Sequence, residues 1–198
     1  MTRSGRPLVA VRDASEDDLP ELLEMWGALR AISGRLDRTA PAPSVEGARR
    51  RLHEVAADPD SRVVVAVVDD EVAGFALMTV QPFAPLFDAR SVHVHYLTVR
   101  PAHRRRGVGH ALMGAATTWA EELGCEHMMT SVYPQLREVN RFYARLGLSP
   151  AVVRRAAPTA LLRRRLTADG VPAVPALARR RTLARVRTAV ARVGAAAE

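Results

Sequence analysis

The chain has 198 residues, of which 48% are apolar, and its 29 basic side chains are all arginine. This length suits one domain with an appendage, and a single cysteine excludes a disulfide framework within the chain. No apolar run approaches the roughly 20 residues that span a bilayer, and the first residues lack a signal-peptide pattern. We therefore expect a cytoplasmic protein that makes no membrane contact.

The net charge of +8 is unevenly distributed along the chain. Residues 151–198 carry 11 arginines against 2 acids, whereas residues 1–150 carry 18 arginines against 19 acids. We expect a folded domain over 1–167 and a basic, helical extension over 168–198. Such an extension either packs on its own domain or a second subunit, contacts nucleic acid or another anionic surface, or stays disordered.

The predicted elements of the first half alternate between strands and helices. A strand over 8–14 leads into a helix that begins with Ser15 in an S-x-x-D pattern, which is typical of a capping box. Ser44 begins a second helix. Residues 61–80 form two β-rich runs around an acidic turn, a hairpin pattern, and Gly74 indicates a bulge or a close backbone approach.

The second half continues with a proline-broken loop over 81–90, a strand over 91–99 and a helix that begins near Gly107. A strand over 126–133 and a helix closed by Gly147 follow. Cys125, between that strand and the preceding helix, is expected to be buried and structural. Two further β segments are expected at 151–156 and 159–166.

The stretch VRPAHRRRGVGHAL (99–112) joins a strand to a helix. Phosphates bind where unpaired backbone N–H groups converge at a helix N-terminus and the helix dipole adds positive potential. Gly107 and Gly109 let the backbone approach an anion, and three preceding arginines add positive charge. The dinucleotide pattern G-x-G-x-x-G fails because position 112 is leucine, and a Walker loop fails because the chain has no lysine. We interpret the stretch as a diphosphate cradle.

The pattern Arg104-x-x-Gly107-x-Gly109, after a strand and before a helix, resembles the GNAT superfamily of N-acetyltransferases. LTVRPAHR before the cradle and NRFYARLGL at 140–148 extend the resemblance, which covers residues 8 to about 166. It implies an α/β fold with a mixed, largely antiparallel central sheet flanked by helices. It also implies acetyl transfer from acetyl-CoA to a primary amine of a small molecule or protein.

The resemblance further implies which residues hold acetyl-CoA. Backbone groups of the strand before the cradle would pair with the pantetheine arm, and amides of the cradle would bind the pyrophosphate. Asn140, on the later helix, would contact the cofactor as well. The residues so implied are Leu97, Thr98, Val99, Arg104, Arg105, Arg106, Gly107, Val108, Gly109, His110 and Asn140.

Tyr143 falls on the family tyrosine near the CoA sulfur, where a phenol would protonate or hydrogen-bond the departing thiolate. The alternative is a tyrosine that only packs in the core. Strand alternation places His93 and His95 on one face with Leu97 and Val99. Counting back from the cradle, His93 aligns with the glutamate base of histone-acetylating members, so the base is His93, His95 or no protein group.

His103 and His110 flank the cradle and are expected to touch phosphate or solvent. Phe83, Leu86 and Phe87 either line the acceptor cleft or pack on the core. No spacing among the histidines, acids and cysteine predicts a metal site. Two other functions stay open: a non-enzymatic acyl-CoA-binding module with a regulatory tail, and a nucleic-acid contact through residues 151–198. A homodimer is also compatible with the sequence.

Overall fold

The computed structural model describes residues 8–32, 44–84, 86, 88–133, 135–152 and 157–169. The chain divides into two compact units, residues 1–153 and 154–198, and each is described by itself. The boundary expected between 167 and 168 stays a prediction. Among the described residues, no helix has the length and apolar character needed to cross a membrane.

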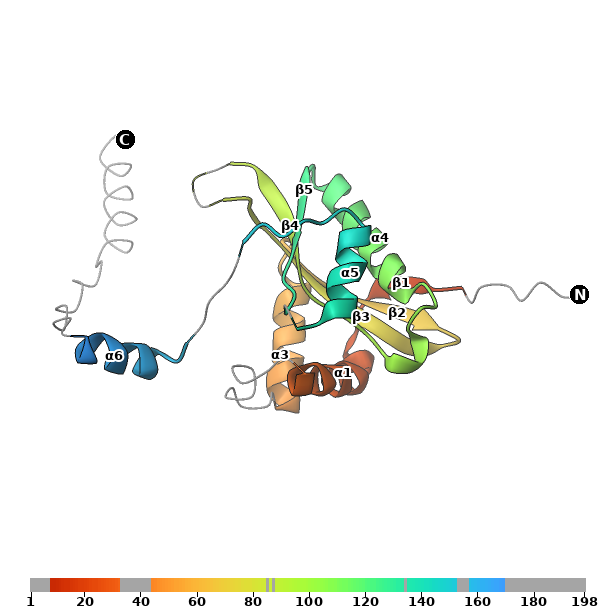
Figure 1. The fold of residues 1–198 in the computed structure, drawn as a ribbon. Helices are drawn as coiled ribbons and strands as arrows, with labels where there is room; N and C mark the ends of the chain where they lie inside the picture. The colour runs from red at the N-terminus through yellow and green to blue at the C-terminus, as the bar shows by residue number, and fades with distance from the viewer. Residues whose placement is uncertain are drawn as a thin grey trace, which may run out of the picture. The chain divides into compact units, whose positions relative to one another are not determined.

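The first unit is built on a five-stranded sheet with the strands in sequence order (Figure 1). Neighbouring strands run antiparallel, except for β4 and β5, which are parallel. This arrangement confirms the expected mixed, largely antiparallel sheet. The strands are β1 (Ala10–Asp13), β2 (Ser61–Val68), β3 (Glu71–Pro82), β4 (Arg90–Val99) and β5 (His127–Thr130).

Helices cover both faces of this sheet. Figure 1 shows α1 and α3 together on one side and α4 and α5 on the other. Two short 3-10 turns, η1 and η2, precede α1 and α4. The bounds are η1 (Glu16–Asp18), α1 (Leu19–Ile32), α3 (Val45–Ala56), η2 (Pro101–His103), α4 (Val108–Glu122) and α5 (Arg137–Arg145).

Local chemistry explains where the helices begin and end. The Ser15 N–H donates to the Asp18 carboxylate at 2.7 Å, which confirms the capping pattern before α1. The Ser44 hydroxyl accepts from the Gly47 N–H at 3.0 Å and caps α3. Gly147 ends the α5 region at φ 89°, a left-handed conformation that favours glycine.

The β2–β3 hairpin also follows its sequence. Asp69 and Asp70 have φ values of 51° and 64°, the pair of positive angles that a two-residue type I′ turn needs. Gly74 confirms both halves of its prediction. The β2–β3 register shifts beside it, between Ala66 and Val67, and a Cβ on Gly74 would lie 2.6 Å from the Thr98 carbonyl oxygen.

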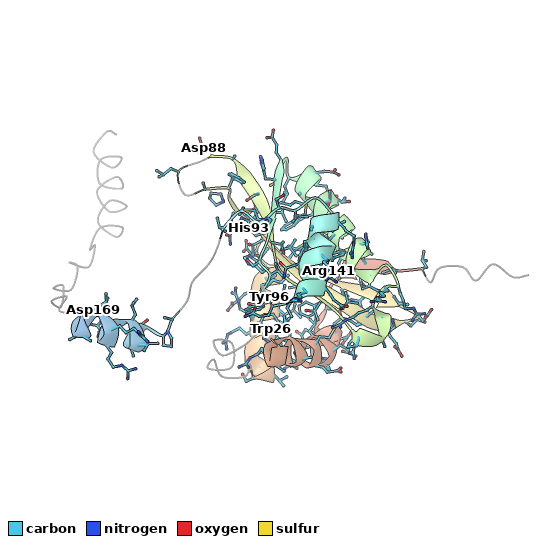
Figure 2. The ribbon with its side chains drawn as sticks, viewed as in Figure 1. Trp26, Asp88, His93, Tyr96, Arg141 and Asp169 are labelled. Atoms are coloured by element: carbon cyan, nitrogen blue, oxygen red, sulfur yellow. The ribbon has the colours of Figure 1, made fainter. Side chains whose placement is uncertain are left out.

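Two apolar clusters fill the unit. The larger one lies between the sheet and α4 and includes Met78, Leu112 and Val108, each at most 1% exposed. Cys125 belongs to it and is buried, as expected. The smaller cluster lies under α1, where the rings of Trp26 and Tyr96 are 4.3 Å apart and lie together in Figure 2.

The second unit contains α6 (Thr159–Ala168). The strand expected at 159–166 is therefore wrong: alanine, leucine and arginine are strong helix formers, and they decide a segment whose apolar pattern alone was ambiguous. Of the other expected strand, Ala151 and Val152 lie outside any strand and 153–156 lie outside the described residues. The basic stretch at 170–198 is also outside them.

Candidate active site

Strands β4 and β5 part at Val94. Their parallel pairing covers only Ser91 to Val94 of β4, although β4 continues to Val99. Two hydrogen bonds mark the last contact, since the Val94 carbonyl accepts from the Thr130 hydroxyl at 3.1 Å and from the Ser131 N–H at 3.4 Å. Among the described residues, β5 makes no further ladder pairs with β4 beyond this point. The β4 edge that faced β5 can therefore accept another hydrogen-bonding chain.

The register decides which amides lie on that open edge. The Arg100 N–H donates to the Ala73 carbonyl at 2.8 Å, so this pair is hydrogen-bonded across β3 and β4. Bonding pairs alternate along an antiparallel ladder, so Thr98 also points its backbone groups at β3. The amides of Leu97 and Val99 point to the open edge. The Thr98 hydroxyl is buried, and no hydrogen-bond partner for it lies among the described residues.

A bulge at His95 divides β4 into two halves. Met78 pairs with Val94 and Leu77 pairs with Tyr96, so His95 is an extra residue opposite β3. The bulge shifts the alternation of faces by one. The prediction that His93 and His95 share one face of the sheet with Leu97 and Val99 is therefore wrong. Leu97 and Val99 pack against the larger apolar cluster, on the face that α4 covers.

The two histidines lie on the opposite face with a set of polar side chains from β3 and β4. The His93 and His95 rings stack 6.0 Å apart. His93 Nε2 is 3.0 Å from the fully buried Ser91 hydroxyl, and His95 Nε2 is 2.7 Å from the Thr79 hydroxyl. His93 itself is 8% exposed, and it is labelled on β4 in Figure 2.

Ser91 is a hydrogen-bond partner of His93. The Ser91 hydroxyl lies 3.0 Å from His93 Nε2 and 3.3 Å from the Gln81 carbonyl oxygen. The tautomer of His93 decides whether the imidazole or the hydroxyl donates in the first of these contacts. Sequence reasoning missed Ser91 as the residue that contacts this ring.

The cradle offers backbone donors. Gly107 is the N-cap of α4 at φ 94° and supplies no capping side chain, so the first N–H groups of the helix have no side-chain partner at that position. The Ala111 N–H is the first to bond within the helix, to Gly107 at 3.0 Å. Arg105, two residues before Gly107, has φ 60°, a strained conformation for a residue with a side chain. These features fit an anion held by backbone amides.

Two side chains of the cradle lie beside the β2–β3 hairpin. His103 is 7% exposed and faces Glu71 on the hairpin, with 3.6 Å between Nε2 and the carboxylate. Its predicted contact with solvent is therefore wrong, and its contact with phosphate stays a prediction. Arg106 lies beside the same hairpin, 3.9 Å from Asp69, whereas the Arg105 side chain is 92% exposed. The β2–β3 hairpin thus packs against the cradle through His103 and Arg106.

Val108 and Gly109 have structural roles in addition to their backbone positions. Val108 is 1% exposed and belongs to the core. A Cβ on Gly109 would lie 3.3 Å from Cζ of Phe142, so the missing side chain makes room for α5. His110 is exposed, and its ring meets Phe142 edge-on at 5.3 Å.

Tyr143 lies on α5 and is 5% exposed. It neighbours Thr130, whose hydroxyl lies where β4 and β5 part. Burial raises the pKa of the phenol above its ordinary value, and the Thr130 hydrogen bond opposes that shift. The phenol therefore stays protonated at physiological pH.

Asn140 forms hydrogen bonds with the loop before α5. Its side-chain amide donates to the carbonyls of Tyr133 at 3.0 Å and Leu136 at 2.9 Å. Its contact with a cofactor stays a prediction. Phe83 lies against the His127 ring at 4.7 Å, Leu86 is 96% exposed, and Phe87 lies outside the described residues. Among those described, no group of His, Cys, Asp or Glu side chains forms a metal-binding cluster.

A mixed sheet whose parallel pair parts beside a glycine-capped helix is the architecture of the N-acyltransferases that the sequence resembles. The family model of the acetyltransferase (GNAT) family matches residues 29–148. Because this is more than half of the chain, the chain belongs to that family.

Two curated relatives are similar in sequence. Streptothricin acetyltransferase from Streptomyces lavendulae is 31% identical over 93 residues, which are 46% of this chain and 47% of that protein. Aminoglycoside N(6')-acetyltransferase type 1 from Klebsiella aerogenes is 38% identical over 72 residues, 35% of this chain and 46% of that protein. The chain thus spans about half the length of the curated relatives it matches.

Solved structures share the fold. An aminoglycoside N-acetyltransferase in complex with CoA aligns with a TM-score of 0.64 at 17% identity, covering 80% of this chain and 99% of the other. A transcriptional regulator from Bacillus halodurans aligns with a TM-score of 0.64 at 23% identity, covering 76% and 99%. At these identities the likeness concerns the fold alone.

Proposed function

We propose that the protein is an N-acetyltransferase that moves an acetyl group from acetyl-CoA to a primary amine of a small molecule. The observation that carries the proposal is the position of Tyr143, which is buried in the cluster that also contains Val108 at the start of α4 and lies beside Thr130, where β4 and β5 part. Membership of the acetyltransferase family supports it.

The open edge of β4 and the start of α4 would hold acetyl-CoA. The amides of Leu97 and Val99 would pair with the pantetheine arm, and the amides of residues 107–110 would bind the pyrophosphate. The exposed Arg104 and Arg105 would add positive charge beside it. Bound there, acetyl-CoA supplies an activated thioester carbonyl.

The chain's own residues would then manage two protons. When the amine nitrogen forms its bond to the acetyl carbon and the carbon–sulfur bond breaks, the nitrogen loses a proton and the sulfur leaves as a thiolate. We assign the nitrogen's proton to His93, directly or through a water, because the Ser91 hydroxyl contacts its ring at 3.0 Å on the polar face of β3 and β4. Tyr143 donates a hydrogen bond or its proton to the thiolate.

The relatives guide the choice of acceptor. The curated relatives are named for streptothricin and for an aminoglycoside, both small-molecule acceptors. On our proposal this chain acts on the same broad class. We keep the cytoplasm as its proposed compartment, because a chain with a single cysteine has no internal disulfide framework. A homodimer and a nucleic-acid contact through the C-terminal arginines remain predictions.

The test is release of the free CoA thiol from acetyl-CoA over a panel of amines, followed by mass analysis of the amine. The panel contains an aminoglycoside, streptothricin, an amino sugar and a lysine-containing peptide. Because the chain has no lysine, acetylation of its own ε-amines adds no background. We expect CoA release that depends on a small-molecule amine. CoA binding without turnover on any amine would favour a binding module instead.

A further inference from the structure

The arginines of the first unit fall into two groups. Most form ion pairs with aspartate or glutamate side chains, and these are Arg12, Arg49, Arg50, Arg51, Arg62, Arg90, Arg100, Arg105 and Arg106. Arg30 has a partner as well. Among the residues that the structure describes in this unit, those without an acidic partner are Arg104, Arg137, Arg141 and Arg145, and all four are exposed. The cations without a counter-charge therefore lie only on the cradle and on α5.

One face of α5 lies against the cradle. Positions 138, 141, 142 and 145 are spaced i, i+3, i+4 and i+7, so their side chains share one face of the helix. Two of them contact the cradle, since the Glu138 carboxylate is 3.9 Å from the Arg105 guanidinium and Phe142 packs on the first turn of α4. The other two are Arg141, which Figure 2 labels on α5, and Arg145. Two unpaired arginines thus lie on the helix face that borders the proposed pyrophosphate site.

The spacing of these arginines is unfavourable for the helix itself. Arg137, Arg141 and Arg145 follow one another at i, i+4 and i+8, and like charges four residues apart destabilise a helix. Arg145 gains from the helix dipole because it lies in the last turn, but Arg141 lies in the middle of α5 and does not. A row of like charges without an acidic partner is the pattern expected where a bound anion supplies the counter-charge.

Coenzyme A carries a second anionic group besides its pyrophosphate. This group is the phosphate monoester on the ribose 3′ oxygen, and a phosphate monoester has about 1.5 to 2 negative charges at pH 7. Arginine suits it, because the guanidinium can donate two parallel hydrogen bonds to phosphate oxygens. Dephospho-CoA lacks only this phosphate and keeps the thiol, the pantetheine arm and the pyrophosphate.

We propose that Arg141 and Arg145 bind the ribose 3′-phosphate of coenzyme A, so that this chain selects the 3′-phosphorylated cofactor over dephospho-CoA. The inference rests on the proposed acetyl transfer for the identity of the cofactor. The reacting thioester is at the other end of the cofactor, so this contact is the same before and during acyl transfer. Its effect therefore belongs to the Kd and the KM for the cofactor and not to kcat.

The test is calorimetric titration of the full chain with CoA and with dephospho-CoA at about 0.15 M salt, where long-range attraction is screened. We expect the natural chain to bind CoA more tightly than dephospho-CoA. Arg141→Gln and Arg145→Gln should each weaken CoA binding by about twofold to fivefold, the range of an exposed ion pair, and leave dephospho-CoA binding unchanged. The control Arg50→Gln removes one exposed charge from α3, on the other side of the sheet, and should change neither affinity.

Equal losses for the two ligands in the α5 variants would overturn the proposal, because the arginines would then supply only a general positive field. Equal affinity of the natural chain for both ligands, or binding of neither, would overturn it as well. Melting temperatures show whether Arg145→Gln acts through the stability of α5 instead.

Turnover is a separate readout and distinguishes this inference from the proposed function. If the natural chain selects CoA over dephospho-CoA through these arginines but acetylates no amine, the inference stands and the proposed function fails. If acetyl-CoA and acetyl-dephospho-CoA support acetylation with the same KM, the proposed function stands and the inference fails.

Discussion

The ring of Phe142 occupies the space that a side chain on Gly109 would need. A Cβ at Gly109 would lie 3.3 Å from Cζ and 3.6 Å from Cε2 of that ring. The absence of a side chain at Gly109 thus allows α5, the helix of Tyr143, to lie close to the start of α4. The second glycine of the motif serves packing between two helices as well as any approach to an anion.

Gly109→Ala therefore sets two effects against each other. Alanine gains about 0.5–1 kcal/mol of helix propensity, and the clash with Phe142 costs about 1–3 kcal/mol as overpacking. We expect a net loss of about 1 kcal/mol in urea unfolding. Gly114→Ala is the matched control on the same helix, since a Cβ there meets nothing within 4 Å, and it should stabilise. Equal effects of the two substitutions would contradict the assigned role of Phe142.

Two Asp–Arg pairs, each with one member on β1, differ in burial, and this difference predicts different contributions to stability. The hydrogen bonds from Arg12, at 2.7 Å each, lower the pKa of Asp18, whose side chain is 4% exposed. The hydrogen bond from Arg62 lowers the pKa of Asp13, which is 63% exposed. Asp18→Asn should cost ~2 kcal/mol at pH 7, whereas Asp13→Asn should stay within ~1 kcal/mol.

The pH dependence follows from the sign of the shift. A carboxyl with a lowered pKa in the folded state binds protons more readily when unfolded. The stability from Asp18 is therefore present above its unfolded pKa of about 3.9 and is lost as the pH falls from there through the folded value. Urea unfolding at several pH values should show the gap between the natural chain and Asp18→Asn closing below about pH 4. A gap that stays constant into that range would show that Asp18 is not stabilised as a carboxylate.

The structure of the cradle could be predicted from the sequence, but the course of β4 before it could not. The place of Gly107 could be predicted because a left-handed backbone at a helix start is a local requirement. The bulge at His95 could not, because it depends on the register of β4 against β3 and no glycine marks it. His103 was misplaced for a similar reason. Its partner Glu71 comes from a hairpin some thirty residues earlier, and only the tertiary fold brings them together.

Ser91 was missed because a small hydroxyl residue in a strand usually makes an ordinary hydrogen bond in the core. The useful signal was its spacing, because Ser91 is two residues before His93 and on the same strand face.

The assignment of the base predicts a difference between neighbouring histidines. A neutral imidazole is the form that accepts a proton, so loss of the base should remove the fall of kcat/KM on the acid side of the pH profile. We expect His93→Gln to remove that limb and to lower kcat at least about a hundredfold, the smallest effect usual for a general base. His95→Gln should keep the limb. Its removal by His95→Gln alone would move the assignment to His95, and its survival in both variants would leave the reaction without a protein base.

Tyr143→Phe tests the proton on the other side of the reaction. The hydroxyl is lost while the buried ring stays, so folding should change by about 1 kcal/mol or less, the net value of one hydrogen bond. A thiol such as that of cysteine has a pKa near 8.5, below that of a phenol, and burial raises the Tyr143 pKa further. Complete proton transfer to the thiolate is therefore unfavourable, and hydrogen bonding in the transition state is the larger contribution.

Because the phenol mainly donates a hydrogen bond, the expected decrease of kcat in Tyr143→Phe is limited. An interaction that strengthens only as the thiolate forms should lower kcat and leave the KM for acetyl-CoA nearly unchanged. A hydrogen bond to a charged group corresponds to a decrease of about tenfold to one hundredfold. Steady-state kinetics at a saturating amine concentration measure it, and a melting curve checks the fold. If kcat stays the same while the melting temperature falls, Tyr143 is a core residue and the thiolate is stabilised by another group.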